Sequence, residues 1–259
     1  MPKASYVRYL MKKMLSSALR TRGWVAFPEW RLPRWPAEQH LKKVFAAYNI
    51  DCVFDVGANT GQFRDLLRED VQYAGPIQSF EPVSGNIATL RERARSDPAW
   101  RIWPWALGRE TQTQTINIYS SPGLSSLLEP DLDAMHKLLP RSDTQITGSE
   151  QVSVRRLDEV FAEVTAGLSF KNIFMKLDTQ GYDLDVIAGA GRALAKVSAL
   201  QTELSILPIY QTIPDYKVAL QTLAAEGFEI SGIFPVTHDH SLRLVEMDCV
   251  MVRHTPAAT

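Results

Sequence analysis

The sequence predicts a doubly wound α/β domain with a mostly parallel, seven-stranded sheet and antiparallel strands at its C-terminal edge. From about residue 50 onward, short apolar runs of strand length alternate with segments whose apolar residues recur at helical spacing. The first apolar run ends in a glycine-containing turn that leads into a helical segment. The last two strand-like runs follow each other without a helix between them, which favours an antiparallel edge.

Each element has its own local signal. The expected strands are short apolar or alternating runs bounded by turn residues, and they lie at 51–56, 77–80, 100–107, 113–119, 152–154, 172–177, 199–204, 228–234 and 242–252. The expected helices carry apolar residues three and four positions apart, and they lie at 37–48, after Thr60, at 84–95, near 131–138, at 157–164, from 183 and at 215–226. Thr60 is expected to cap the second of these helices. Residues 120–148 are otherwise expected to form a long irregular loop, and such loops are commonly functional.

Composition excludes several classes of protein. Of the 259 residues, 45% are hydrophobic and 22% are charged, as in an ordinary globular protein. The net charge of -1 gives no general attraction to nucleic acid, so no nucleic-acid partner is expected. The two cysteines, Cys52 and Cys249, lie in apolar runs and are expected to be buried thiols, a usage typical of the cytoplasm. No apolar run approaches the ~18 residues that a membrane-spanning helix needs.

The N-terminal residues 1–36 are predicted to form a basic helical extension and a connector, followed by one domain at 37–259. Residues 1–28 contain six basic residues and no acidic one, with apolar residues at helical spacing between them. This helix could pack on its own domain or on a partner subunit of a homo-oligomer. Alternatively, it could hold a cytoplasmic protein at the inner face of an anionic membrane. Residues 23–36 contain three prolines and are expected to be non-helical.

The turn after the first strand is the most informative segment. In an open α/β sheet, ligands bind at the carboxyl ends of the strands, where the first loop meets a helix N-terminus. Gly57 and Gly61 permit a tight turn and the close approach of a cofactor. Asp55 would repel a pyrophosphate, but its carboxylate can receive the ammonium group of a methionine moiety. This order favours S-adenosylmethionine over a nicotinamide cofactor, and the expected binding residues of the turn are Asp55, Gly57, Ala58, Asn59, Thr60 and Gly61.

Glu81 ends the second strand, 20 residues after Gly61, and Pro82 follows it. An acid at this point can accept hydrogen bonds from both ribose hydroxyls of an adenosine. Trp105 and Ala106 end the third expected strand. We expect these residues to border the ribose and adenine of the cofactor.

Polar residues at the ends of later strands are the candidates for methyl transfer. The reaction requires the protein to orient an oxygen nucleophile and to accept its proton. Asp178 is the first candidate and is also expected to contact the cofactor, unless it only caps the next helix. Glu203 is the second candidate. His238 and His240, in a turn before the last strand, are either further candidates for the base or idle surface residues. No set of residues has metal-ligand spacing, so no metal is expected.

Several motifs in sequence order resemble the FkbM family of methyltransferases. They cover about residues 50–205 and comprise Phe54 to Gly61, Ser79 to Pro82 with Asn86, Ala106 to Gly108, Ser125 to Leu127, Arg155 to Glu159, and Lys176 to Tyr182 with Leu184, Val186 and Gly189. The resemblance implies a class I, Rossmann-like methyltransferase sheet and O-methylation of a hydroxyl on a sugar, a glycan or a secondary metabolite. It also implies that Ser125 and Ser126 contact the substrate.

Gln180 departs from the family pattern. The family usually has valine-glutamate-glycine after the aspartate that matches Asp178, whereas this chain has Thr179-Gln180-Gly181. The change puts in doubt any base or metal role of that glutamate, and we expect Gln180 to contact the substrate. It also leaves open a non-catalytic cofactor-binding or assembly partner in a biosynthetic complex. A nicotinamide-dependent oxidoreductase is a further alternative, which Asp55 and the absence of a G-x-G-x-x-G motif disfavour.

Overall fold

The computed structural model describes residues 29–140 and 142–253, and residue contacts divide the chain into two compact units, Met1–Ala37 and Glu38–Thr259. In the first unit, Glu29–Arg31 form a 3-10 turn. Helix α2 (Trp35–Ala47), of which residues 38–47 belong to the second unit, begins two residues earlier than predicted. Pro36 fits the first turn of a helix, where its missing N–H costs no hydrogen bond. The predicted basic helix at 1–28 lies outside the described residues. None of the described helices has the length and apolar character needed to cross a bilayer.

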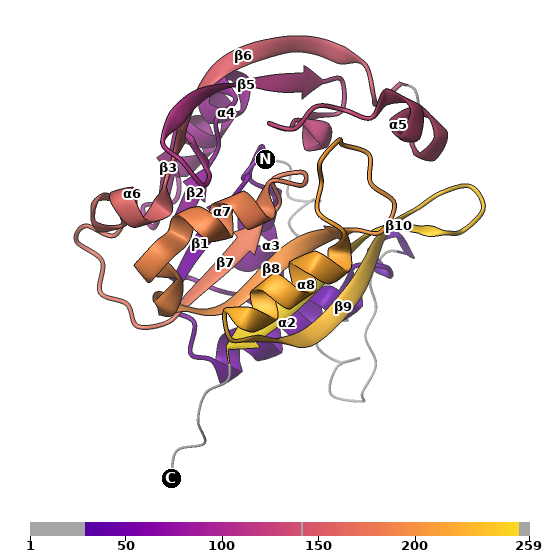
Figure 1. Cartoon of the computed structure of the whole chain (residues 1–259). Coiled ribbons are helices and arrows are strands. Elements are labelled where there is room, and N and C mark those ends of the chain that lie inside the picture. The colour runs from indigo at the N-terminus through magenta and orange to yellow at the C-terminus, as the bar shows by residue number, and fades with distance from the viewer. Residues whose placement is uncertain (1–28, 141, 254–259) are drawn as a thin grey trace, which may run out of the picture. The chain divides into compact units, whose positions relative to one another are not determined.

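The predicted seven-stranded sheet forms the centre of the second unit, with the strand order β3-β2-β1-β7-β8-β10-β9 (Figure 1). Neighbouring strands from β3 to β8 are parallel, whereas β10 runs antiparallel to both β8 and β9. This arrangement confirms the predicted antiparallel C-terminal edge. The strands are β1 (Cys52–Val56), β2 (Ile77–Phe80), β3 (Trp100–Trp103), β7 (Ile173–Leu177), β8 (Val197–Ser205), β9 (Phe228–His238) and β10 (Leu244–Arg253).

Helices cover both faces of this sheet. On one face, side chains such as Phe54 and Met175 pack in a core with α6 (Leu157–Val164), α7 (Asp183–Ala190) and α8 (Tyr216–Ala225). On the other face, Val53 and Phe174 pack with α2, α3 (Gln62–Leu66) and α4 (Ser84–Ala94). Burying each large apolar side chain stabilises the fold by roughly 1.5–3 kcal/mol, so two cores hold the strand ends in place.

The helix after the first turn differs from the prediction at its start. Gly61, and not Thr60, is the N-cap residue of α3, and no side chain caps the helix there. Gly61 has a φ of 94°, a left-handed conformation that glycine adopts without strain. The helix then continues as a π-helical turn at Leu67–Val71.

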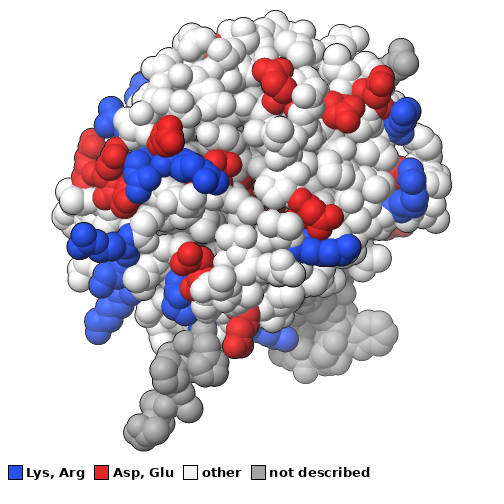
Figure 2. All heavy atoms as spheres, viewed as in Figure 1, with Lys and Arg blue, Asp and Glu red and all other residues white. Residues whose placement is uncertain are grey.

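A second sheet, which the sequence did not predict, consists of β4 (Ala106–Leu107), β6 (Ile146–Arg155) and β5 (Gln112–Tyr119) in that order. The predicted strand at 100–107 is therefore two strands in two different sheets. A 3-10 turn (Pro122–Leu124) and helix α5 (Leu132–Leu138) lie between β5 and β6. Figure 1 shows β5 and β6 arching across the top of the view. On the face drawn in Figure 2, acidic and basic side chains are interspersed.

Candidate functional site

A cavity lies at the carboxyl ends of β1, β2 and β7, where residues of the second sheet and its loop close over them. It holds about 630 Å³ of empty space, part of it open to solvent. The lining residues are Val56, Gly57, Asn59, Phe80, Glu81, Pro82, Val83, Asn86, Ala106, Leu107, Ile116, Gly123, Ser125, Ser126, Leu127, Asp178, Thr179 and Gln180.

Gly57 lies where the first turn passes the end of β7. It has a φ of 79°, and a Cβ atom there would lie 2.0 Å from the carbonyl oxygen of Asp178. The N–H groups of Gly57 and Ala58 both donate to the carbonyl oxygen of Phe80, at 3.0 and 3.1 Å. The turn is therefore tied to the ends of both neighbouring strands, and only glycine fits this crossing.

Glu81, at the end of β2, is 4% exposed. Its Oε2 accepts a hydrogen bond from Asn59 N at 2.7 Å, and its Oε1 accepts from Val83 N at 2.9 Å and from Asn86 Nδ2 at 3.3 Å. Burial raises the pKa of Glu81 to about 7, although these hydrogen bonds favour the ionised form. Because each carboxylate oxygen offers about two acceptor sites, both oxygens can still accept from a ligand if Asn86 moves away.

Asp178 directly follows β7, and its side chain is 40% exposed. Its Oδ2 accepts a hydrogen bond from Lys176 Nζ at 2.9 Å. The ammonium group of Lys176 also lies 3.8 Å from Oδ1 of Asp55. Burial acts to lower the pKa of Lys176, but the two neighbouring carboxylates outweigh it and raise this pKa. A permanently charged lysine therefore fixes one oxygen of Asp178 and leaves the carboxylate facing the cavity.

Gln180 forms hydrogen bonds both to residues of the seven-stranded sheet and to Ser126, in the loop between β5 and β6. Its Nε2 donates to Asp178 Oδ1 at 3.2 Å and to Glu203 Oε2 at 2.7 Å. Its Oε1 accepts from the hydroxyl of Tyr210 at 3.2 Å, and its carbonyl oxygen accepts from Ser126 Oγ at 2.9 Å. An amide suits this position because it can donate to two carboxylates and still accept from a phenol.

Glu203 belongs to a group of carboxylates behind Gln180, outside the cavity lining. It lies opposite Asp248 on β10, and Glu246 lies two pairs further along the same two strands, opposite Ser205. Burial raises the pKa of Asp248 to about 6 and that of Glu246 to about 7, and the charge of Asp178 raises both. Burial and Asp178 likewise raise the pKa of Glu203. Glu203 therefore reaches the cavity through Gln180 and not directly.

Nine of the residues predicted for the site line the cavity: Gly57, Asn59, Glu81, Pro82, Ala106, Ser125, Ser126, Asp178 and Gln180. The remaining residues of the first turn, Ala58, Thr60, Gly61 and Asp55, do not line it. Asp55 is fully buried, and Ser79 Oγ donates to its Oδ2 at 3.0 Å. Burial also raises the pKa of Asp55. Its contact with a methionine ammonium group stays a prediction.

Trp105 packs beside Trp103, with ring centroids 5.3 Å apart, and the guanidinium group of Arg155 lies 4.8 Å from its ring centre. Of the two residues predicted to border the adenine, Ala106 lines the cavity and Trp105 does not, and the contact with adenine stays a prediction. Trp105 lies away from the cavity because the chain leaves the first sheet and enters the second at this point. The backbone makes a tight turn there, in which Trp105 N donates to Trp103 O at 3.0 Å.

His238 and His240 are exposed in the hairpin between β9 and β10, outside the cavity lining. Between them, Asp239 accepts hydrogen bonds from the backbone N–H groups of Ser241 and Arg243, at 2.8 and 3.0 Å. These hydrogen bonds give Asp239 a structural role in stabilising the turn. The catalytic role of the two histidines stays a prediction without a contact to the cavity.

Several lining residues were not predicted. Val83 and Asn86 follow Glu81 at the start of α4, and their place directly after a strand end is a signal that could have identified them. Ile116, Gly123 and Leu127 come from the second sheet and its loop, whose packing leaves no local signal in the sequence. Among the described residues, no group of three or more His, Cys, Asp or Glu side chains is arranged to hold a metal ion.

Comparison with known proteins identifies the family of the chain. Residues 55–230 match the family model described as "Methyltransferase FkbM domain". The 31-O-demethyl-FK506 methyltransferase FkbM of Streptomyces tacrolimicus is 31% identical over 158 residues, which are 54% of this chain and 59% of that protein. The chain thus spans less than two thirds of this curated relative.

Two solved structures are also similar. Methyltransferase FkbM from Methylobacillus flagellatus shares 16% identity, with 79% of this chain and 44% of that chain covered and a TM-score of 0.46. Magnesium protoporphyrin IX methyltransferase from Synechocystis PCC 6803 shares 12% identity, with 87% and 82% covered and a TM-score of 0.43.

The order of the strands, together with the glycine turn after β1, defines a class I methyltransferase domain. The methyl donor of this class is S-adenosylmethionine. Since the family match extends over more than half of the chain, the chain belongs to the FkbM family of S-adenosylmethionine-dependent methyltransferases.

Proposed function

We propose that this protein transfers the methyl group of S-adenosylmethionine to a hydroxyl group of a sugar, a glycan or a secondary metabolite. The observation that carries the proposal is one cavity that holds Glu81, the turn at Gly57 and the exposed carboxylate of Asp178. The Streptomyces relative is named as a 31-O-demethyl-FK506 methyltransferase, which supports an oxygen acceptor on a secondary metabolite.

The cavity residues fit this cofactor. Glu81 is almost fully buried, its Oε2 keeps an acceptor site, and its Oε1 gains one if Asn86 moves away, which suits the two neighbouring hydroxyls of a ribose. The residues described as lining the cavity include two carboxylates and no lysine, arginine or histidine. Such a lining favours a sulfonium cation and disfavours the pyrophosphate of a dinucleotide.

The chain's own residues then have distinct roles. Glu81 would hold the ribose, and the turn from Gly57 to Asn59 would border the cofactor. When bound, the sulfonium supplies an electrophilic methyl group. Asp178 would orient the acceptor hydroxyl and take its proton as the new O–C bond forms, and Lys176 would hold the carboxylate in position. Ser126 and Gln180 would shape the acceptor end of the cavity.

A thermal-shift comparison tests the cofactor. S-adenosylmethionine and S-adenosylhomocysteine should raise the melting temperature, because a ligand that binds only the folded state stabilises it, whereas NAD should not. Stabilisation by NAD alone would refute the proposal. A transfer assay with a labelled methyl donor and extracts of the source cell then tests the acceptor.

The same assay separates catalysis from a second candidate function. Gln180, in the place of the family's glutamate, favours a non-catalytic member that binds the cofactor and acts as an assembly partner. Cofactor binding without methyl transfer to any extract fraction would support that candidate.

A further inference from the structure

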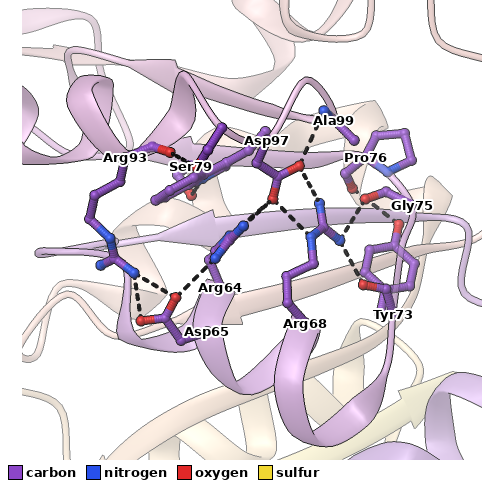
Figure 3. Close-up of polar contacts among 12 residues, drawn as sticks. Arg64, Asp65, Arg68, Tyr73, Gly75, Pro76, Ser79, Arg93, Asp97 and Ala99 are labelled. Atoms are coloured by element: carbon purple, nitrogen blue, oxygen red, sulfur yellow. Dashed lines mark hydrogen bonds and ion pairs between the residues drawn. The ribbon is translucent and has the colours of Figure 1, made fainter. Parts of the chain in front are cut away.

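Outside the cavity lining, a network of arginines and aspartates lies beside the first turn (Figure 3). Asp97, which is 7% exposed, accepts hydrogen bonds from Arg64 Nη2 at 2.6 Å and from Arg68 Nε at 2.9 Å. Asp65 accepts from Arg93 Nη2 at 2.5 Å on each oxygen, and from Arg64 Nη1 at 3.1 Å. These bonds join α3, the π-helical turn after it, α4 and the loop before β3.

Trp100, the first residue of β3, is 4% exposed and held by this network. The guanidinium carbons of Arg64 and Arg93 lie 5.2 and 5.7 Å from the centre of its ring, within cation–π range. Its Nε1 donates to Ser79 Oγ at 2.9 Å, and that hydroxyl donates to Oδ2 of Asp55. The two arginines therefore hold the face of the indole ring, and the hydrogen bond to Ser79 holds its edge.

The end of the first turn rests on this ring. A Cβ atom at Gly61 would lie 2.8 Å from Cη2 of Trp100 and 3.0 Å from Nη1 of Arg93, so the backbone of Gly61 contacts both. The same Nη1 donates to the carbonyl oxygen of Thr60. One residue earlier, the N–H of Asn59 donates to Glu81. A continuous set of contacts thus leads from Trp100 through the turn to the carboxylate in the cavity.

We propose that Trp100 is a positioning residue for the cofactor. Its ring, clamped by Arg64 and Arg93, sets the position of the turn at Thr60 and Gly61 and thereby the hydrogen bond to Glu81. The proposal rests on the assignment of this turn and Glu81 to the cofactor. Trp100 is not among the residues that line the cavity, and it acts through the turn, because a small displacement of positioning groups is costly.

Two substitutions separate the contributions of the ring. Trp100→Phe keeps an aromatic face under the arginines and removes the Nε1–H donor. Trp100→Leu removes the aromatic face as well. In Trp100→Leu, we expect the Kd for S-adenosylmethionine, measured by calorimetry, to rise about tenfold, which corresponds to about 1.4 kcal/mol. The rise in Trp100→Phe should be smaller, because one hydrogen bond is lost and the packing is largely kept.

Trp103→Phe is the matched control. Trp103 lies on the same strand, and its Nε1 donates to Gln78 Oε1 at 3.0 Å, so the substitution also exchanges an indole for a phenyl ring and removes one hydrogen bond. Trp103 packs against the core on the other face of the sheet, whereas Trp100 belongs to the core that contains Ala58 of the turn. We expect the control to bind the cofactor with the Kd of the wild type.

Nuclear magnetic resonance distinguishes a positioning role from a merely structural one, because a merely structural role would leave the signals of Trp100 unchanged when the ligand binds. The indole N–H signals of Trp100 and Trp103 are assigned by their loss in the two phenylalanine variants. On addition of S-adenosylhomocysteine, the signals of Trp100 and of the Gly61 amide should shift, and that of Trp103 should stay in place.

The outcomes are distinguishable. If the Trp100 variants bind as tightly as the wild type while Glu81→Ala binds weakly, the role of Trp100 is refuted and the cofactor site stands. If Glu81→Ala also binds as tightly as the wild type, the assignment of the turn fails and the role of Trp100 fails with it. Equal losses of thermal stability in Trp100→Phe and Trp103→Phe, with unchanged Kd values, would show a structural role only.

Discussion

Glu81→Gln tests the cofactor site most sharply, because it removes the charge and nearly keeps the size of the side chain. The wild-type carboxyl, with a pKa of about 7, is mostly ionised at pH 8 and mostly protonated at pH 6. If only the ionised form binds the ribose, the Kd for S-adenosylmethionine should rise about tenfold between pH 8 and pH 6. The glutamine variant should lose this dependence on pH.

The magnitude follows from the environment of the carboxyl. A pKa raised from 4.5 to about 7 means that the folded environment as a whole, burial offset in part by the hydrogen bonds, penalises the ionised form by about 3 kcal/mol. Its charge-assisted hydrogen bonds to a ligand should offset part of this penalty, at roughly 1.5–3 kcal/mol each. At pH 8, Glu81→Gln should therefore weaken binding by at least about tenfold.

The stability of the ligand-free protein should respond to pH in the opposite direction. Because the pKa of Glu81 is higher in the folded protein than in the unfolded chain, the folded state takes up its proton first as pH falls. This group alone makes the protein more stable as pH falls from about 7 to 4.5, and this contribution is lost as pH rises through 7. Relative to the wild type, Glu81→Gln should thus be more stable at pH 8 than at pH 5.

Calorimetric titrations at pH 6, 7 and 8 provide the measurement. The amino group of the ligand also titrates near the upper end of this range. Glu246, near the acceptor end, has a pKa of about 7 as well. The ratio of the Kd values of variant and wild type removes both contributions. A ratio that stays constant from pH 6 to pH 8 would refute the assignment of Glu81 to the ribose.

Three further results are expected. Asp178→Asn should keep the wild-type Kd for the cofactor but lower turnover by about two orders of magnitude, the range of general base catalysis, and a retained rate would assign the proton to another group. Gly57→Val should abolish cofactor binding and lower the melting temperature, because its Cβ would collide with the carbonyl oxygen of Asp178, and an unchanged melting temperature would contradict this contact. Treatment with a chelator should leave the rate of methyl transfer largely unchanged, whereas a loss that a divalent cation restores would show a metal-dependent enzyme.

The main sheet could be predicted because its strands are buried. All five residues of β1 and of β7 are buried, so each appears as a mainly apolar run between turn residues, interrupted only by Asp55 in β1 and Lys176 in β7. The second sheet could not be predicted in the same way. The first four residues of β6 are exposed, and only two of its ten residues are buried, so the strand has no apolar signature over most of its length. Its pairing with β5 depends on contacts distant in sequence.

The predicted site residues that line the cavity are placed there by the local backbone. Gly57 and Glu81 are fixed by the ends of β1 and β2, where chain direction alone brings them to the same edge of the sheet. Asp55 was expected there too, but side chains alternate along a strand. Phe54 and Val56 point to the core beneath α6, α7 and α8, so Asp55 points to the opposite face, beside Ser79. The sequence predicts this alternation but not which face borders the cavity.

The expected indifference to chelators follows from the chemistry of Gln180. Its amide Nε2 donates to both Asp178 and Glu203, so hydrogen atoms occupy the space between two carboxylates that a cation would otherwise bridge. A carboxylate at position 180 would place three acids together, and a metal ion is one way to relieve such repulsion. The hydroxyl of Tyr210 lies 3.2 Å from the amide oxygen and 2.7 Å from the carbonyl oxygen of Leu124, so these two acceptors share its one hydrogen. The ammonium group of Lys176 already balances the charge of Asp178. The amide of Gln180 and the ammonium group of Lys176 thus relieve the repulsion between carboxylates that a divalent cation would otherwise relieve. Gln180→Glu is the substitution that should make the activity sensitive to chelation.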